Sequence, residues 1–422
     1  MIRHRVVFPL LGFLVVLGAL GAWQAVSLHR LHVLEGREND ANPVKAQPVA
    51  DLRRSMKSPL AFVRVVVDAR TMLNGRKPKV IIDPDGHGAV IGAQAGRAGF
   101  ALYRPGRPPV IINPYSGGMG AEDAQAADLD GDGPPDIVVG GLDDVTFELH
   151  NPRNGACSDV YRCPWTKTVI DTKHASHDVV VGDVDRDGTI DVATESGVYF
   201  NRRNEHDWPF AGRRLIARDG EGTSLGDLAG DGILDIVAPY RSGTILARFV
   251  NPLHHGGDPR HDVWAVQPID AHPLFSGNMT TAIADINGDG RADIVLAPMY
   301  GGGGLVWYAG PKAGDHVWQR HMIAPTINFV HQGSLQVRDF TGDGRPDIAF
   351  AEQDQSPTRR VGIFYNVRGD GSRWREQVLG LNGGHNIKAG MLGHDRNPSI
   401  VSARHGYFGG ANPLVAWKPQ PG

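Results

Sequence analysis

The stretch Asp339-Phe-Thr-Gly-Asp-Gly-Arg-Pro-Asp347-Ile-Ala decides the fold because the chain repeats it. Its pattern is D-x-[DNT]-x-D-G-x-x-D, followed by an apolar run. The same pattern begins at Asp128, Asp183 and Asp285. A single acidic turn would say little about a fold, whereas several copies at similar intervals indicate a repeat architecture.

The loop has oxygen-bearing side chains at its positions 1, 3, 5 and 9, around a glycine at position 6. Calcium binds six to eight oxygen ligands in flexible geometry, and glycine permits the sharp bend. A fifth copy, which begins at Asp227, has Ala229 at position 3 and therefore lacks one ligand. We expect about four to five calcium ions. The predicted ligands are Asp128, Asp130, Asp132, Asp136, Asp183, Asp185, Asp187, Asp191, Asp227, Asp231, Asp235, Asp285, Asn287, Asp289, Asp293, Asp339, Thr341, Asp343 and Asp347.

These loops differ from EF-hands, which need an acidic ligand at position 12. Position 12 is Val139, Thr194, Leu296 or Phe350 in the four complete copies. The apolar run that follows each loop is typical of a strand rather than a helix. An acidic turn without metal is the alternative, and four complete ligand sets favour the metal.

The repeats indicate a β-propeller. Successive loops begin 44 to 58 residues apart, and a period near 50 is typical of propeller blades or solenoids. A second signature, an apolar-aromatic strand that often ends in Asn-Pro, occurs seven times, at residues 100–105, 145–152, 198–201, 245–252, 305–311, 361–366 and 414–419. A third, Trp-x-x-x-x-Ile, follows at residues 165–170, 264–269 and 318–323, with a looser form at 374–379. Four strands a unit make one blade, so we predict an all-β, seven-bladed propeller with four-stranded blades.

The first and last blades have lost their acidic loops. Degenerate versions occur after Val65–Asp68 and within residues 389–401. The last blade stops after its third strand, at Trp417, and an open edge would favour aggregation. We therefore expect residues near 44–56 to supply its fourth strand.

The repeated loop followed by Ile-Val resembles the FG-GAP and VCBS repeat proteins, calcium-loop β-propellers that include the head of the integrin α subunit. Phe-Gly and Gly-Ala-Pro motifs are mostly absent, so the chain looks more like the bacterial VCBS-repeat class. The resemblance implies a propeller with calcium in its loops. It leaves activity open, because some members of the broader class are sugar dehydratases or polysaccharide lyases.

The N-terminal part has a different character. Residues 6–28 are an uncharged apolar run preceded by Arg3 and Arg5, which indicates export with the N-terminus inside. Residues 1–30 are thus a signal peptide or a membrane anchor, residues 31–57 a linker and residues 58–422 the propeller. We expect a periplasmic or extracellular location. Cys157 and Cys163, the only cysteines, then favour a disulfide, with two free thiols as the alternative.

A ligand would bind at the face opposite the calcium loops. Each innermost strand runs into its loop, so the residues about six before the first aspartate surround the other mouth of the central channel, a natural concave site. We predict catalytic roles there for His177, Asp178, His331 and His385, and ligand binding for Glu122, Asp123, Glu221, Asn278, Gln332 and Asn386. Histidine beside a carboxylate can transfer protons at neutral pH. Alternatively, these residues only satisfy loop hydrogen bonds around a hydrated channel.

Composition adds little about partners. The formal net charge is −3, from 43 basic and 46 acidic residues. No Gly-rich phosphate loop, G-x-S-x-G, His-Glu-x-x-His or zinc-type cysteine pair occurs. We expect a monomeric binding scaffold for a carbohydrate or another surface protein, without nucleic acid, and in contact with the membrane if residues 6–28 are retained. The alternative is a lyase or dehydratase acting on an acidic or oxidised sugar at the channel mouth.

Overall fold

The structure is a computed structural model, and the chain divides into two units, residues 1–57 and residues 58–422. Everything described below belongs to the second unit. The structure describes residues 62–68, 81–82, 90–94, 99–103, 110–113, 121–141, 146–152, 157, 163–174, 176–202, 221–312, 315–392, 396–403 and 414–420.

The described residues form seven antiparallel sheets, six with four strands and one with three. The first three sheets contain β2 (Ile81–Ile82), β3 (Val90–Gln94), β4 (Gly99–Tyr103) and β5 (Val110–Asn113); β6 (Ala121–Ala127), β7 (Asp136–Gly141), β8 (Thr146–His150) and β9 (Thr166–Asp171); and β10 (Val180–Gly182), β11 (Asp191–Thr194) and β12 (Gly197–Tyr199).

The next two sheets contain β13 (Ser224–Gly226), β14 (Asp235–Tyr240), β15 (Ile245–Val250) and β16 (Ala265–Asp270); and β17 (Met279–Ala284), β18 (Asp293–Pro298), β19 (Gly302–Ala309) and β20 (Gln319–Asn328). The last two contain β21 (Leu335–Arg338), β22 (Asp347–Ala351), β23 (Val361–Asn366) and β24 (Trp374–Gly380); and β25 (Asn386–Gly390), β26 (Ser399–Ala403), β27 (Leu414–Pro419) and β1 (Phe62–Asp68). A short 3-10 helix, η1 (Pro252–His255), follows β15.

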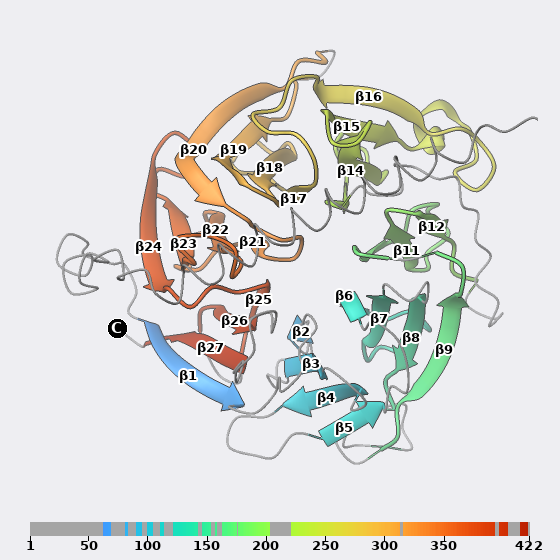
Figure 1. The fold of residues 1–422 in the computed structure, drawn as a ribbon. Helices are drawn as coiled ribbons and strands as arrows, with labels where there is room; N and C mark the ends of the chain where they lie inside the picture. Colours follow the sequence, from blue (N-terminus) through green and yellow to red (C-terminus); the bar gives the residue numbers. More distant parts are fainter. Residues whose placement is uncertain are drawn as a thin grey trace, which may run out of the picture. The chain divides into compact units, whose positions relative to one another are not determined.

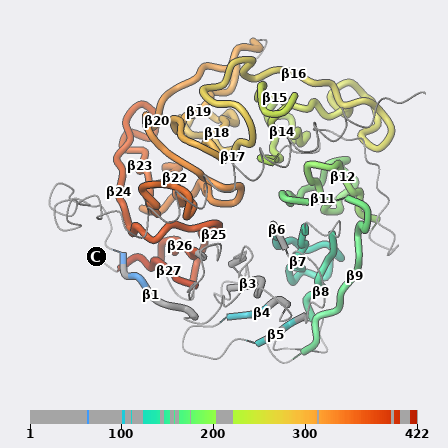
Figure 2. Tube along the Cα trace, viewed as in Figure 1, coloured from blue at the N-terminus to red at the C-terminus, as the bar shows by residue number. Residues whose placement is uncertain are grey.

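The sheets stand around a common centre, as Figure 1 shows. The innermost strands β2, β6, β10, β13, β17, β21 and β25 each contact the next, and β25 contacts β2 again. Chain order follows the circle, from green through yellow to red in Figure 2. This arrangement is a β-propeller, as the repeat period predicted.

The two strand signatures are confirmed. Every apolar-aromatic segment overlaps the third strand of its sheet, from β4 to β27, and the tryptophan segments overlap the fourth strands β9, β16, β20 and β24. The third strands are largely buried on both faces; β23, for example, is buried at every position. The fourth strands β9, β16 and β20 are mainly exposed, and β24 is half-buried. Burial therefore decreases from the third strand of a blade to the fourth.

The prediction of seven four-stranded blades is met in six sheets. The β10–β12 sheet has three strands in the described part of the chain, and residues 203–220, which lie between β12 and β13, are outside it. The structure therefore shows six complete blades, not seven.

The predicted closing segment is corrected. β1 completes the last blade by pairing antiparallel with β27, with Phe62 opposite Pro419 and Val65 opposite Ala416, and Figure 1 shows the blue β1 beside the red β27. Residues 44–56 lie outside the described residues. Val65–Asp68 was expected to lead into the first blade's degenerate loop, and it is instead the outer strand of the last blade. The alternation of Phe62–Asp68 identifies a strand but does not specify its partner.

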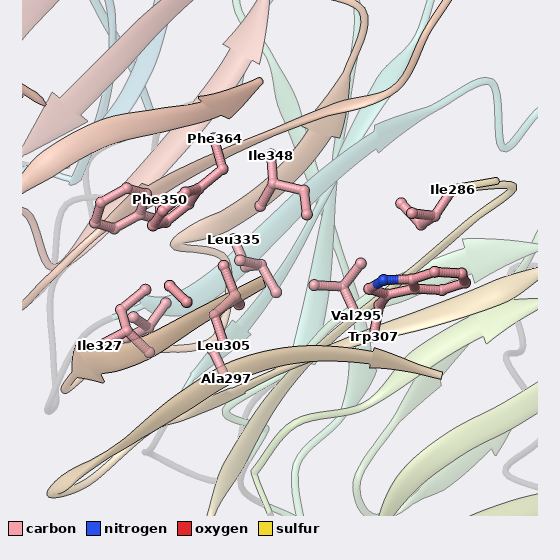
Figure 3. Close-up of a cluster of buried hydrophobic side chains, with 12 residues drawn as sticks. Ile286, Val295, Ala297, Leu305, Trp307, Ile327, Leu335, Ile348, Phe350 and Phe364 are labelled. Atoms are coloured by element: carbon pink, nitrogen blue, oxygen red, sulfur yellow. The ribbon is translucent and has the colours of Figure 1, made fainter. Parts of the chain in front are cut away.

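The apolar core lies between the blades. One cluster joins Val295 and Trp307 of one blade to Ile348 and Phe364 of the next, and Figure 3 shows these side chains between the two sheets. Other clusters join further neighbouring sheets in the same way, and the one that contains Tyr103 and Leu414 connects the first blade to the last. Each blade thus buries its faces only with its neighbours in place, which makes the ring cooperative.

Cys157 and Cys163 form a disulfide, with Cα atoms 6.3 Å apart. No helix in the described ranges is long and apolar enough to cross a membrane. The predicted signal or anchor segment, residues 6–28, lies outside those ranges.

Candidate functional site

Two histidines from different blades face one carboxylate at the predicted channel mouth. The Nε2 atom of His331, which precedes β21, lies 3.3 Å from Oε2 of Glu221. The Nε2 atom of His177, which precedes β10, lies 3.7 Å from Oε1 of the same side chain. Glu221 itself precedes β13. Its side chain is 9% exposed, that of His331 1% and that of His177 23%, so His177 is the most accessible of the three.

Two further residues complete this group, and the sequence analysis missed both. Oε1 of Glu195 lies 3.0 Å from Nδ1 of His177 and accepts a hydrogen bond from the His177 backbone N–H. The hydroxyl of Tyr300 donates to Oε1 of Glu221 at 3.4 Å. We call His177, Glu195, Glu221, Tyr300 and His331 the mouth cluster.

Glu195 and Tyr300 share a position that could have been found. Each follows the second strand of its blade, β11 or β18, at the turn into the third strand. In an antiparallel blade the end of the second strand lies beside the start of the first. These turns therefore reach the same face as the residues that precede the innermost strands.

The other predicted catalytic histidine, His385, lies beside this cluster. Its ring packs against that of His331, with centroids 4.1 Å apart. Its Nδ1 lies 2.8 Å from Oδ1 of Asn386, whose Nδ2 donates to the carbonyl of Gln332 at 2.8 Å. Gln332 in turn donates to the carbonyl of Thr223 at 3.0 Å. His385, Asn386 and Gln332 are all buried, so they form a network that joins neighbouring blades.

The two predicted aspartates of the mouth also connect blades. Oδ2 of Asp178 accepts the backbone N–H groups of Gly222, at 2.6 Å, and Thr223, at 2.8 Å. Burial, followed by the charges of Glu195 and Glu221, raises the pKa of Asp178 well above its usual range. Asp123 repeats the arrangement, because its Oδ2 accepts the N–H of Val179 at 3.1 Å. These carboxylates accept backbone hydrogen bonds from the segments that begin the neighbouring innermost strands.

Of the remaining predicted ligand-binding residues, Asn278 offers its carbonyl to the N–H of Met299 at 3.2 Å. The side chain of Glu122 lies outside the described part of the chain.

The channel contains a cavity of about 430 Å³ between the innermost strands. Its polar lining includes Asp123, Thr223, Gln332, Arg338 and Lys388. The ammonium of Lys388 lies 3.8 Å from Oδ1 of Asp123, and both side chains are buried. Thr223 and Gln332 lie close in sequence to Glu221 and His331, so the cavity begins next to the mouth cluster.

The repeated loops lie at the opposite ends of the innermost strands and have one geometry. In the first loop, Oδ1 of Asp128 accepts the N–H of Gly131 at 2.7 Å and Oδ2 that of Gly133 at 3.1 Å. The glycine at position 6 has a positive φ in all five loops, for example 102° at Gly133 and 82° at Gly344, a conformation that costs glycine little. The expected sharp bend is therefore present.

The aspartate at position 9 is buried in every loop. One oxygen of Asp136 accepts the N–H of Leu129 at 3.1 Å, and the other accepts the N–H of Asn151, at the end of β8, at 2.8 Å. Burial raises the pKa of Asp136 to about 7 and that of Asp191 to about 8. A divalent cation in the loop would offset that cost by stabilising the ionised form.

Carboxylates in two of the complete loops come close enough to share a cation. Oxygens of Asp128, Asp130 and Asp132 lie within 4.8 Å of one another, as do those of Asp183 and Asp185 with Asp191. Carboxylate oxygens at such spacing are the ligands that calcium prefers. These residues fit the predicted cation.

An arginine also contacts the Asp183 loop. Arg260, in the segment after η1, donates to Oδ2 of Asp185 at 2.7 Å and to Oδ2 of Asp187 at 2.9 Å. The second oxygen of each carboxylate accepts a bond within the loop: Oδ1 of Asp185 from the N–H of Asp187 at 3.2 Å, and Oδ1 of Asp187 from the N–H of Thr189 at 2.9 Å. The guanidinium thus lies beside the ligand set of this loop, at positions 3 and 5.

The Asp227 loop does not fit the cation in the same way. Nδ1 of His254 lies 2.8 Å from Oδ2 of Asp231, and its Nε2 lies 3.1 Å from Oδ1 of Asp235. The guanidinium of Arg248 lies 2.6 Å from the other oxygen of Asp235. Basic side chains of the same blade therefore contact the carboxylates at positions 5 and 9, while position 3 is alanine.

Comparison with known proteins agrees with this geometry. Residues 285–350, from the Asp285 loop to β22, match the model of the FG-GAP-like repeat. No curated protein matches the chain by sequence. Among solved structures, two crystal structures of BBS1N in complex with ARL6DN are 13% identical to this chain. One has a TM-score of 0.52 and covers 87% of this chain and 99% of its own. The other has a TM-score of 0.50 and covers 86% of this chain and 97% of its own.

A lectin from Agrocybe aegerita, described as recognising non-reducing terminal N-acetylglucosamine, is 20% identical over 76% of this chain and 81% of its own, with a TM-score of 0.46. At these identities the likeness concerns the fold. The chain is a β-propeller in which residues 285–350 match the FG-GAP-like repeat, as the repeated loop predicted.

Proposed function

We propose that the protein is an exported, calcium-stabilised propeller that binds a carbohydrate at the channel mouth. The observation that carries this proposal is the convergence of His177 and His331, from separate blades, on Glu221. Imidazole and carboxylate groups both pair with sugar hydroxyls, which donate and accept hydrogen bonds. Tyr300, 49% exposed beside Glu221, offers an aromatic face on which a sugar ring can pack.

A cavity in the channel next to the mouth cluster supports this proposal. Its volume of about 430 Å³ lies within the size range of small-ligand pockets, and its lining includes the polar residues Asp123, Thr223 and Gln332. Its walls come from several blades that the interblade core and the buried aspartates hold in place. A preorganised site of this kind loses little entropy when a ligand binds. A surface protein that presents the same hydroxyl or amide groups is the other ligand that the site would accept.

The test is a glycan panel probed with the purified protein and three variants. We expect His177→Ala and Tyr300→Ala to lower binding of the best glycan at least tenfold, a loss of about 1.4 kcal/mol. His261→Ala is the matched control, because His261 is 78% exposed and pairs with Asp258 in the segment after η1, away from the mouth. Absence of any glycan binding, or equal loss in all three variants, contradicts the proposal.

A sugar lyase or dehydratase is the second candidate, and the side chains of His177, His331 and Glu221 favour it. An imidazole beside a carboxylate can remove the proton next to a sugar carboxylate or ketone. The electron pair of that C–H bond then forms the C=C bond as the leaving group departs. The test is incubation of uronate-containing glycans at pH 7 and detection of unsaturated products. Products formed by wild type and lost in His177→Ala identify the enzyme, whereas binding without products identifies the scaffold.

We propose calcium for the loops that begin at Asp183, Asp285 and Asp339, which offer oxygen ligands alone, and a divalent cation for the Asp128 loop. We propose no cation for the Asp227 loop, because Arg248 and His254 contact its carboxylates. This makes the expected number about four. Metal analysis of the purified protein after equilibration with calcium tests it, and a fifth tightly bound ion contradicts it.

We further propose that the protein is exported. Residues 6–28 would direct export and, if retained, anchor the protein; the Cys157–Cys163 disulfide suits an oxidising compartment. Fractionation of cells that make the full chain tests the location.

A further inference from the structure

The Asp128 loop has a histidine in its ligand region, which the loops at Asp183, Asp285 and Asp339 lack in the described residues. His150 ends β8, and its Nδ1 lies 3.9 Å from Oδ2 of Asp130 and 3.9 Å from Oδ1 of Asp136. One ligand atom from each of these three residues lies within 4.8 Å of the others. Ligand atoms around a single bound metal have separations of this order, because each stands about 2.0–2.2 Å from the metal.

A buried carboxylate next to this group provides an independent observation. Glu148, on the same side of β8 as His150, is 2% exposed. Its Oε1 lies 3.2 Å from Nδ1 of His150, yet it accepts no hydrogen bond in the described residues. A carboxylate in that position, facing other carboxylates, is stabilised by a cation within reach.

The equivalent positions in other blades show that this glutamate is particular to the Asp128 loop. Glu148 lies three residues before Asn151, at the end of the third strand. The corresponding residue is Arg248 in the Asp227 blade, where it contacts Asp235, and Val198 in the Asp183 blade. This position therefore carries the guanidinium of Arg248 in one blade and the apolar side chain of Val198 in another. In the Asp128 blade it carries the carboxylate of Glu148, which lies beside the imidazole of His150.

We propose that Asp130, Asp136, Glu148 and His150 form a mixed nitrogen–oxygen site for a borderline divalent metal of the zinc or cobalt kind. Calcium takes oxygen ligands, whereas imidazole nitrogen suits zinc and its neighbours in the first transition row. Oγ1 of Thr168 on β9, 3.1 Å from Nε2 of His150, fixes the ring with Nδ1 toward the carboxylates. Such an outer partner is usual for histidines that bind metals.

The test uses the purified protein, treated with chelator and then kept in excess calcium so that the oxygen-only loops are filled. Cobalt is added, its visible absorption followed, and zinc binding measured by calorimetry. We expect one equivalent of either metal to bind in the presence of calcium. Glu148→Gln and His150→Gln should each weaken that binding at least tenfold, and His150→Gln should also alter the cobalt absorption.

Two control variants separate this site from others. His261→Ala removes an exposed histidine away from the Asp128 loop, and His331→Ala removes one from the mouth cluster; both should bind cobalt as the wild type does. Circular dichroism identifies any variant that fails to fold. If His150→Gln fails to fold, cobalt binding by Glu148→Gln alone tests the proposal. No uptake in excess calcium, unchanged uptake by both Asp128-loop variants, or loss of uptake in His331→Ala overturns the proposal.

Discussion

The side-chain amide of Asn201 donates a hydrogen bond of 2.7 Å to the backbone carbonyl of Leu129, in the acidic loop of the preceding blade. Its own backbone N–H donates to Oδ1 of Asp191, at position 9 of its own loop, at 2.7 Å. One asparagine thus joins two successive loops. Asn251 and Asn366 repeat the interblade bond, to Val184 at 2.8 Å and to Ile286 at 2.7 Å. The asparagine at the end of the third strand therefore links blades in three cases.

We expect Asn251→Ala to destabilise the propeller by about 1–3 kcal/mol, because it leaves the buried carbonyls of Val184 and Leu234 without their donor. Asn251 is fully buried, so water cannot replace the amide. Chemical denaturation measures the change, and Asn382→Ala, at an exposed asparagine, is the control. Equal stability of the two variants would show that the amide bond is not structural.

Removal of calcium should lower the melting temperature, because an ion that binds only the folded state stabilises it by about 2.7 kcal/mol at a hundredfold excess over its Kd. Asp343→Ala should reduce the gain in stability on adding calcium. Asp231→Ala is the matched substitution in the Asp227 loop, where His254 contacts the carboxylate, and it should leave that gain unchanged. Scanning calorimetry with and without chelator measures both, and equal effects would refute the distinction.

The sequence predicted those features that depend on local chemistry. The loop at Asp339 needs a glycine with positive φ and oxygen side chains, and both are visible in one stretch of residues. The third strands need buried aromatic and branched residues, which is why all seven segments were found. The residues at the channel mouth were predicted by counting back along each innermost strand from its acidic loop. This placed His177, Glu221 and His331 at the same mouth.

The features that sequence did not predict depend on partners far apart in the chain. Phe62–Asp68 pairs with β27 across almost the whole sequence, and nothing in its alternation distinguishes that partner from another strand. Tyr300 reaches Glu221 only because the turn after β18 lies at the mouth of the neighbouring blade. Arg360, whose sequence neighbour Arg359 suggests an exposed basic cluster, is instead paired with Glu352 and Glu376, and its side chain is 16% exposed.

Closure by β1 can be tested with two N-terminal truncations. A protein that begins at Ser58 retains β1 and should keep the melting temperature of the exported chain. A protein that begins at residue 69 exposes the edge of β27, whose unpaired backbone groups would pair with another chain, so it should dimerise or aggregate. Light scattering and thermal melting compare the two. If the shorter protein stays monomeric and equally stable, β1 does not close the ring.

The pair of Glu352 and Arg360 gives a pH-dependent prediction. Oε1 of Glu352 lies 2.9 Å from Nη2 of Arg360, and Oε2 accepts the Arg360 backbone N–H at 2.9 Å. Burial alone would raise the pKa of Glu352, but its hydrogen bonds to Arg360 outweigh burial and hold that pKa below the usual value. The ionised carboxylate therefore contributes stability above the pKa of the unfolded chain, about 4.3, and this contribution is lost as the pH falls through the lower folded pKa.

We accordingly expect Glu352→Gln to cost about 3–5 kcal/mol at pH 7, because the Arg360 guanidinium, largely buried, loses its main charged partner. The cost should shrink as the pH falls below about 4, because the unfolded chain then binds a proton at Glu352, and it should vanish once the pH is below the lower folded pKa. Glu376→Gln is the control; its side chain is 27% exposed and it contacts the same guanidinium at 2.6 Å, so its cost at pH 7 should be smaller. Urea denaturation at several pH values measures these differences, and a cost for Glu352→Gln that does not change with pH would show that the charge of Glu352 does not stabilise the fold.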